Sequence, residues 1–132
     1  MSEPALPPAA DRQPAIRVTA MPSDANPSGD IFGGWLMAQM DLAAGAVAMR
    51  VARGRTVTVA VEAMTFLSPV AVGDEVSVYA DLVSRGRSSM RISVEAWRRE
   101  RHADARIKVT EAVFTFVAID ENRRPAPPPD PS

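Results

Sequence analysis

The chain has 132 residues, of which 46% are hydrophobic, and this length and composition allow one folded domain with a buried core. Its 15 basic and 16 acidic residues leave a net charge of −1, which provides no electrostatic basis for binding nucleic acid or an anionic membrane surface. The chain has no cysteine, so disulfides, thiolate zinc sites and a cysteine nucleophile are excluded.

Proline is concentrated at both ends of the chain. Nine of the 12 prolines fall in residues 1–14 and 125–132, where they remove backbone hydrogen bonds. This predicts flexible tails at 1–14 and 122–132 around one domain at 15–121. The N-terminus has no basic flank before an apolar stretch, and Gln39 and Asp41 interrupt the longest apolar run. We therefore expect no signal peptide and no membrane span, and a cytoplasmic protein.

The first elements are predicted from changes in apolar periodicity. Residues 14–21 (PAIRVTAM) alternate apolar and polar side chains and predict a strand, and the loop PSDANPSGD follows it. Residues 33–52 predict a helix. One stripe along this helix is apolar: Leu36, Met40, Ala44, Val47 and Val51. A second stripe is mostly small: Gly34, Ala38, Asp41, Gly45 and Ala48. The two stripes predict a helix that is covered on most sides by a sheet.

From Arg55 onward the apolar period changes to two. The pattern predicts strands from there to Pro69 and within 75–83, 89–97 and 105–119, with turns at 73–74, at Gly86 and at 101–104. Strands joined by short turns pair antiparallel, so we expect an α+β fold with about five curved strands around one long helix. The last strand is apolar on both faces over 112–119, and its outer face is expected to meet another subunit.

The sequence gives little support for a catalytic histidine, a metal site or a nucleotide-binding loop. The only histidine, His102, lies in a predicted turn among charged residues, which is typical of a solvated side chain and not of a catalytic base. No histidine and carboxylate cluster has metal-ligand spacing, and neither GxGxxG nor GxxxxGK[ST] occurs. We expect no metal and no cofactor, so catalysis would depend on carboxylates, amides, hydroxyls and helix termini.

Asp41 is the single charged side chain in residues 33–49. Burial of an unpaired carboxylate is costly, so Asp41 either has a function or lies at a solvent-exposed edge of the helix. Gly33 and Gly34 stand at the helix start, where free N–H groups and the positive end of the helix dipole attract an anion or an oxyanion. Close packing would also explain the two glycines. Together these residues are compatible with a hydrolytic site.

The tripeptide Arg-Gly-Arg occurs at 53–55 and again at 85–87, where Ser88 and Ser89 follow it. Guanidinium, hydroxyl and backbone N–H donors on a tight turn suit a phosphate group. Arginines in turns are also commonly only solvated, so both interpretations stay open.

Three segments resemble, in order and spacing, the acyl-CoA thioesterases of the hotdog fold, and specifically the bacterial YciA type. They are MPSDANPSGDIFGGWLMAQMDLAAGAVA (21–48), the stretch from RTVTVAVEAMTFLSPVAVGDEVSVYADL through VSRGRSSMRISVEAW (55–97), and TEAVFTFVAID (110–120). The resemblance implies a long helix wrapped by a five-stranded antiparallel sheet. It also implies homodimers with continuous sheets, a homohexamer built as a trimer of dimers, and hydrolysis of acyl-CoA to a free acid and CoA.

The resemblance further implies site residues. The family's catalytic aspartate falls on Asp41 and the loop asparagine on Asn26, which act together from opposite subunits. Asp30, close to Asn26, is a rival for the acid-base role. The glycines near the thioester carbonyl are Gly33 and Gly34. The turn associated with the nucleotide end of CoA comprises Gly86, Arg87, Ser88 and Ser89.

Two alternatives to hydrolysis stay open. A hotdog dehydratase or hydratase normally pairs a carboxylate with a histidine, and His102 is misplaced for that role. A non-catalytic module that binds or senses acyl-CoA is the other alternative, because a fold alone does not establish activity.

Overall fold

The computed structural model describes residues 6–126. Its elements in chain order are β1 (Ile16–Thr19), a short 3₁₀ turn η1 (Pro22–Asp24), α1 (Gly33–Ala52), β2 (Thr56–Phe66), β3 (Glu75–Arg85), β4 (Ser89–Arg99) and β5 (Arg106–Ala118). The helix and the five strands confirm the α+β prediction, and α1 has the predicted bounds.

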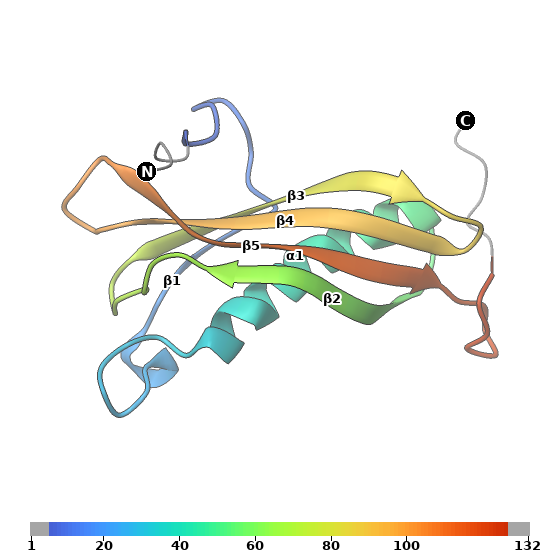
Figure 1. Cartoon of the computed structure of the whole chain (residues 1–132), viewed down its shortest axis with the longest axis horizontal. Coiled ribbons are helices and arrows are strands. Elements are labelled where there is room, and N and C mark those ends of the chain that lie inside the picture. The colour runs from blue at the N-terminus through green and yellow to red at the C-terminus, as the bar shows by residue number, and fades with distance from the viewer. Residues whose placement is uncertain (1–5, 127–132) are drawn as a thin grey trace.

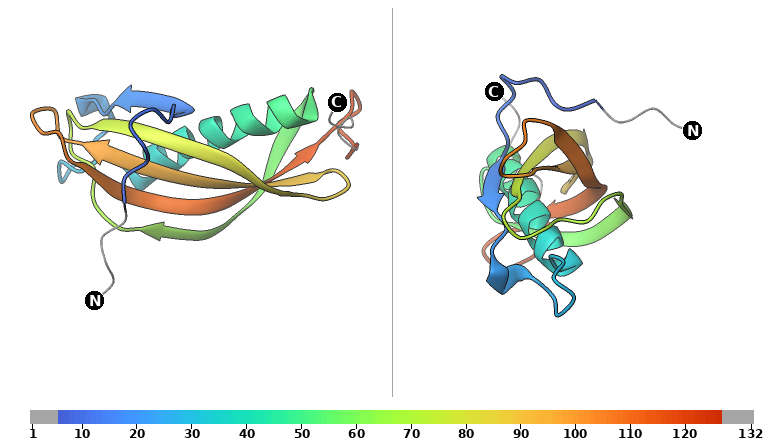
Figure 2. Two further views of the ribbon diagram at one scale, coloured as in Figure 1. Left: turned by 90° about the horizontal axis from the view of Figure 1, so that it is seen from above. Right: turned by 90° about the vertical axis from the view of Figure 1, so that its left-hand side faces the viewer.

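The strands form one antiparallel sheet in the order β1-β3-β4-β5-β2. The chain crosses over after β2, so β2 pairs with β5 and lies at an edge of the sheet. Figures 1 and 2 show α1 running along one face of the curved sheet. The short turns after β3 and β4 join neighbouring strands, as the sequence predicts.

The core lies between α1 and the sheet. Leu36, Met40 and Ala44 from the predicted apolar stripe are buried there, and Val47 and Val51 pack against the core while partly exposed. A further sheet-facing row on α1 is made by small residues: Ala43, Ala48 and Ala52. The apolar periodicity thus correctly identifies the face of the helix that packs against the sheet.

The opposite side of α1 is not covered within one chain. Leu42 is 61% exposed and Met49 is 53% exposed. The prediction that the helix is covered on most sides is therefore wrong for the single chain, because one sheet can contact only one side of a helix. The stripe of small residues on α1 does not by itself indicate whether a strand of the same chain or another subunit packs against it.

The edge strand β2 also exposes apolar side chains. Val59, Val61 and Phe66 are 55%, 39% and 53% exposed. The strand is irregular, with register shifts against β5 and a left-handed backbone at Ala63 (φ 53°). An edge strand of 11 residues with exposed apolar side chains is a surface on which another chain can pair.

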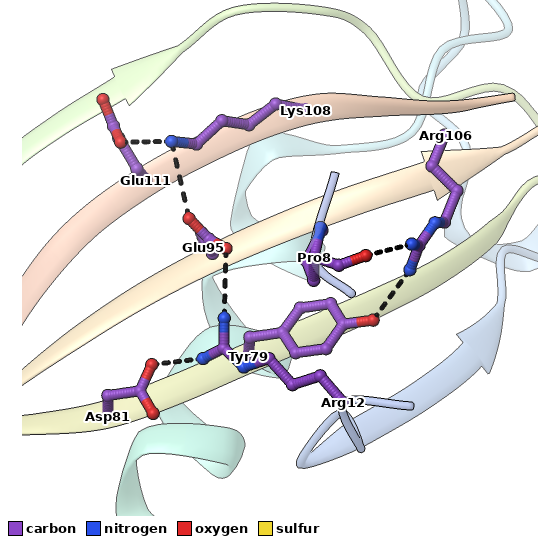
Figure 3. A network of polar contacts seen from close by, with 8 residues as sticks. All are labelled: Pro8, Arg12, Tyr79, Asp81, Glu95, Arg106, Lys108 and Glu111. Atoms are coloured by element: carbon purple, nitrogen blue, oxygen red, sulfur yellow. Dashed lines mark hydrogen bonds and ion pairs between the residues drawn. The ribbon is translucent and has the colours of Figure 1, made fainter. Parts of the chain in front are cut away.

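Residues 8–12 lie against the face of the sheet opposite α1, as Figure 3 shows. Arg12 forms ion pairs with Asp81 and Glu95, and its guanidinium lies 4.8 Å from the centre of the Tyr79 ring. Arg106 donates hydrogen bonds to the Tyr79 hydroxyl at 3.1 Å and to the carbonyl oxygen of Pro8. Tyr79 is buried beneath these contacts. Part of the proline-rich N-terminal segment is thus anchored by side-chain contacts on the sheet.

The same network includes a lysine on β5. The Lys108 Nζ lies 2.5 Å from a carboxylate oxygen of Glu111 and 3.5 Å from one of Glu95. Burial lowers the pKa of Lys108, but the hydrogen bonds and negative charges of Glu111 and Glu95 outweigh that effect, so its pKa is raised.

Candidate active site

Asp41 lies where the helix meets the beginning of β2. Its Oδ1 accepts a hydrogen bond from the Thr58 hydroxyl at 2.6 Å, and the residue is half-buried. One helical turn further on, a Cβ atom on Gly45 would lie 3.7 Å from the Phe116 ring, so α1 approaches the sheet closely here. Asp41 is therefore neither fully buried nor fully solvated. Sequence reasoning missed Thr58, whose only signal is a polar residue between two valines.

Asn26 organises the loop that precedes α1. Its Oδ1 accepts hydrogen bonds from the backbone N–H groups of Ser28 (2.9 Å) and Asp30 (3.1 Å), and its own N–H donates to the Asp30 carbonyl (2.7 Å). An asparagine that closes such a local turn commits its oxygen and leaves its amide NH₂ group available for another acceptor. The rival carboxylate, Asp30, lies on the same loop and is exposed.

The start of α1 lies beside the end of β2. A Cβ atom on Gly33 would lie 3.5 Å from the Phe66 ring, whereas nothing lies within 4 Å of the same position on Gly34. Phe32 precedes the helix and provides no side-chain cap. The first N–H groups of a helix have no intrahelical acceptor, so those of Gly33 and Gly34 can bind an oxyanion.

A cavity of about 380 Å³ adjoins this helix start. Its walls are mostly apolar and come from the helix start and from the segment that follows β2: Ile31, Phe32, Gly33, Leu36, Phe66, Leu67, Ser68, Pro69 and Val70. An apolar cavity beside oxyanion donors has the character of a site for an acyl group.

The turn at 86–89 closes the hairpin of β3 and β4. The Gly86 N–H donates to the Ser89 carbonyl at 2.8 Å, and a Cβ atom on Gly86 would lie 2.5 Å from the Ser89 hydroxyl oxygen. The Ser88 carbonyl accepts a hydrogen bond from the Ala118 N–H at 2.8 Å. Arg87 is exposed on this turn. The turn therefore lies beside the C-terminal end of β5.

The start of α1 and the turn at 86–89 lie at opposite ends of the sheet. Gly33 lies beside Phe66 at the end of β2, whereas the turn at 86–89 bonds to Ala118, which pairs with Thr56 at the beginning of β2. A strand of 11 residues is roughly 30 Å long. Figure 1 shows the loop before α1 and the β3–β4 turn at opposite ends of the molecule.

Asp41 and Asn26 do not contact each other within one chain. Asp41 bonds to Thr58 and Asn26 bonds to its own loop. Asp41 therefore lies with Thr58 near the beginning of β2, and Asn26 lies on the loop that leads to Gly33.

His102 is exposed on the turn between β4 and β5. In residues 6–126 no group of three or more histidines and carboxylates is placed to hold a metal ion. Over the same residues, no helix combines the length and the apolar character needed to cross a membrane.

Comparison with known proteins gives consistent results. Residues 28–105 match the thioesterase superfamily. An uncharacterised acyl-CoA thioester hydrolase of Zymomonas mobilis is 58% identical over 117 residues, which cover 89% of this chain and 78% of that protein. The acyl-CoA thioester hydrolase YciA of Salmonella typhimurium is 50% identical over 117 residues, covering 86% of this chain and 88% of that protein.

A solved structure agrees with these sequence matches. HI0827 is described as a hexameric broad-specificity acyl-coenzyme A thioesterase, and the crystal structure is that of an aspartate-to-alanine mutant enzyme. It superposes with a TM-score of 0.84 at 48% identity, covering 88% of this chain and 86% of the other.

Proposed function

We propose that this chain, which belongs to the thioesterase superfamily and resembles the YciA type, hydrolyses acyl-CoA to a free carboxylic acid and CoA. The observation that carries the proposal is the carboxylate of Asp41, held by Thr58 at the junction of α1 and the exposed edge strand. The aspartate replaced in the HI0827 mutant supports giving the catalytic role to an aspartate.

In the proposed reaction the thioester carbonyl binds the free N–H groups of Gly33 and Gly34, which stabilise negative charge on its oxygen. Asp41 takes a proton from water as the water oxygen attacks the carbonyl carbon. Alternatively, the Asp41 carboxylate attacks that carbon and displaces the thiolate, and water then hydrolyses the resulting anhydride to the free acid and restores Asp41. The amide of Asn26 orients the water or the carboxylate. The carbon–sulfur bond then breaks, and the CoA thiolate leaves.

The leaving group explains why no histidine is required. A thiol has a pKa of about 8.5, so the thiolate departs without prior protonation by a general acid. CoA enters only as part of the substrate and leaves as a product, and the proposal includes no cofactor.

The proposal requires two copies of the chain in each site. If β2 pairs antiparallel with β2 of a second copy, the Thr58 end of one strand comes beside the Phe66 end of the other. Asp41 of one chain then faces the partner's Asn26 and the partner's Gly33. The same pairing covers the exposed Val59 and makes one continuous sheet. It supports a homodimer as the functional unit, and the hexameric HI0827 supports a trimer of such dimers.

The test is release of free thiol from a series of acyl-CoAs with increasing chain length. Hydrolysis across part of the series supports the proposal, and the profile defines the acyl preference. The matched control is Asp41→Asn, which keeps the shape of the side chain. If the native protein binds free CoA but releases no thiol from any member, the non-catalytic binding module is the better description.

A further inference from the structure

Two aromatic side chains are buried on the face of the sheet opposite α1. Tyr79 and Trp97 are each almost fully buried, yet neither belongs to the core between α1 and the sheet. In the pairing of β3 with β4, Tyr79 lies opposite Glu95 and Trp97 lies opposite Ser77, so the two rings are diagonal neighbours. We call the surface around Tyr79 and Trp97 the aromatic face. Because α1 covers the other side of the sheet, other groups must bury these two rings.

The segment of residues 6–12 covers part of the aromatic face. Pro8 and Arg12 are its only partly buried residues, and the other five are exposed. The Arg12 guanidinium lies 4.8 Å from the centre of the Tyr79 ring, and the Pro8 carbonyl accepts a hydrogen bond from Arg106 (Figure 3). Among residues 6–126 no backbone–backbone hydrogen bond joins this segment to a strand. The segment is therefore held by a side chain and one carbonyl, as a bound peptide is.

The segment also has an internal structure that suits a ligand. The Arg12 N–H donates to the Ala9 carbonyl at 3.0 Å and closes a turn directly after Pro7 and Pro8. Proline fixes φ and has no N–H, so the two prolines limit the conformations of the segment and keep their carbonyls free for donors from outside. Such a segment loses less conformational entropy on binding than a fully flexible one.

The aromatic face provides groups that complement the segment. Arg12 forms ion pairs with Asp81 and Glu95, and Glu95 lies directly opposite Tyr79. The charged sheet residues in Figure 3 are three carboxylates and two cations: Asp81, Glu95, Glu111, Arg106 and Lys108. Three negative and two positive charges leave a net charge of −1, which one arginine neutralises. The face therefore favours a ligand that carries a cation.

Trp97 adds a donor that has no acceptor in residues 6–126. Its Nε1 is buried and forms no hydrogen bond within that part of the chain. Nearly all buried N–H groups have a partner, so this one requires an acceptor that reaches the aromatic face. A peptide carbonyl fits, because aromatic side chains with a polar tip line the grooves that bind proline-rich segments.

We propose that the aromatic face is a docking surface for a proline-rich peptide that carries an arginine, and that its ligand is residues 6–12 of the same chain. Two residues separate Arg12 from Ala15, whose N–H donates to the Val78 carbonyl at 2.8 Å, so the segment reaches the face from its own chain. The arginine provides the charge and the prolines provide the carbonyls. This inference does not rest on the proposed function, because no residue of the proposed catalytic site takes part.

The first test measures how well the segment protects Tyr79. Tyr79 is the only tyrosine and the chain has no cysteine, so formation of nitrotyrosine with tetranitromethane reports on Tyr79 alone. Arg12→Ala removes the ion pairs and the ring contact and leaves every strand residue unchanged. Nitration should then be about tenfold faster than in the native protein, because the rate follows the population of the detached segment.

The second test supplies the ligand as a separate molecule. A synthetic peptide of residues 6–14 (LPPAADRQP) is added to the Arg12→Ala protein at millimolar concentration, which is on the order of the effective concentration that a short tether provides. It should return the nitration of Tyr79 to nearly the native rate. The same peptide with Arg12→Ala should leave the fast rate unchanged, and neither peptide should alter the rate of the native protein.

Arg17→Ala is the matched control, because Arg17 contacts Ser77 and Glu75 on the same face but lies outside the segment. It should keep the native nitration rate. A native rate in the Arg12→Ala protein overturns the proposal. So does a fast rate that the native-sequence peptide fails to reduce, because Arg12 would then stabilise the sheet without the segment acting as a ligand. Equal protection by the two peptides also overturns it, since the arginine would not be recognised.

Discussion

The Thr58 hydroxyl on β2 donates a hydrogen bond to the Asp41 carboxylate on α1, with 2.6 Å between Oγ1 and Oδ1. This bond connects the middle of the helix to the edge strand that a second copy would pair with. It occupies one carboxylate oxygen and leaves the other for water or a substrate. The orientation of Asp41 is thus determined by a residue 17 positions further along the chain.

Asp41→Asn should fold normally and lose catalysis. The amide keeps the size of the side chain but can serve neither as a base nor as a nucleophile. We expect kcat for acyl-CoA to fall roughly a hundredfold or more. Asp30→Asn is the matched control and should retain most of the activity. A dead Asp30→Asn variant beside an active Asp41→Asn variant would assign the role to the other carboxylate.

Thr58→Val should lower kcat without removing the carboxylate, because valine has the same shape and cannot donate a hydrogen bond. One such bond contributes about 1.4 kcal/mol, so we expect roughly a tenfold decrease. Thr58→Ser keeps the hydroxyl and should restore most of the rate, while both variants keep a native melting temperature within a few degrees. Equal activity of the valine and serine variants would show that the bond does not position Asp41 for catalysis.

Mixed oligomers should recover activity that each parent lacks. Asn26→Ala and Asp41→Asn should each be nearly inactive alone. In a mixed dimer one site receives both substitutions and the other receives neither. Random pairing makes half the dimers mixed and leaves half their sites intact, so co-expression should restore about a quarter of the native activity. Two different affinity tags isolate the mixed dimers, in which the recovered activity should be about half the native value. Activity no higher than the average of the parents would place the whole site within one chain.

Lys108 should stabilise the fold in a pH-dependent manner. Its pKa is raised in the folded protein, so its contribution is fully present below the unfolded pKa of about 10.4 and is lost as pH rises through the higher folded value. Lys108→Gln should therefore melt a few degrees below the native protein at pH 7 to 9, at a fixed protein concentration. The difference should shrink above about pH 10.5.

Arg91→Gln provides the control for this measurement, because it removes an ion pair with Glu62 on the same sheet without removing a lysine. Its effect on the melting temperature should persist at alkaline pH. A Lys108→Gln difference that is constant from pH 7 to pH 11 would mean that packing, and not charge, accounts for the role of Lys108.

Sequence alone determined the helix and the strands of this protein and the candidate catalytic residues. The helix at 33–52 follows from its apolar periodicity, and the strands follow from alternation bounded by turns, because both signals arise from interactions between residues close in the chain. The same local reasoning indicates Asp41 as a candidate, because it is a charge in an otherwise apolar helix, and its catalytic role stays a prediction. Gly33 and Gly34 are predicted as oxyanion donors from their place at the helix start, and that role also stays a prediction.

The tertiary structure decided which of these residues lie together. Local periodicity does not predict that β2 pairs with β5, because strand pairing depends on contacts between distant segments. The bond between Thr58 and Asp41 depends on where that pairing places β2, and the anchoring of Arg12 on Tyr79 depends on the pairing of β3 with β4. The separation of Gly33 from the turn at 86–89 has the same origin, since an 11-residue strand keeps the two halves of the site apart in one chain.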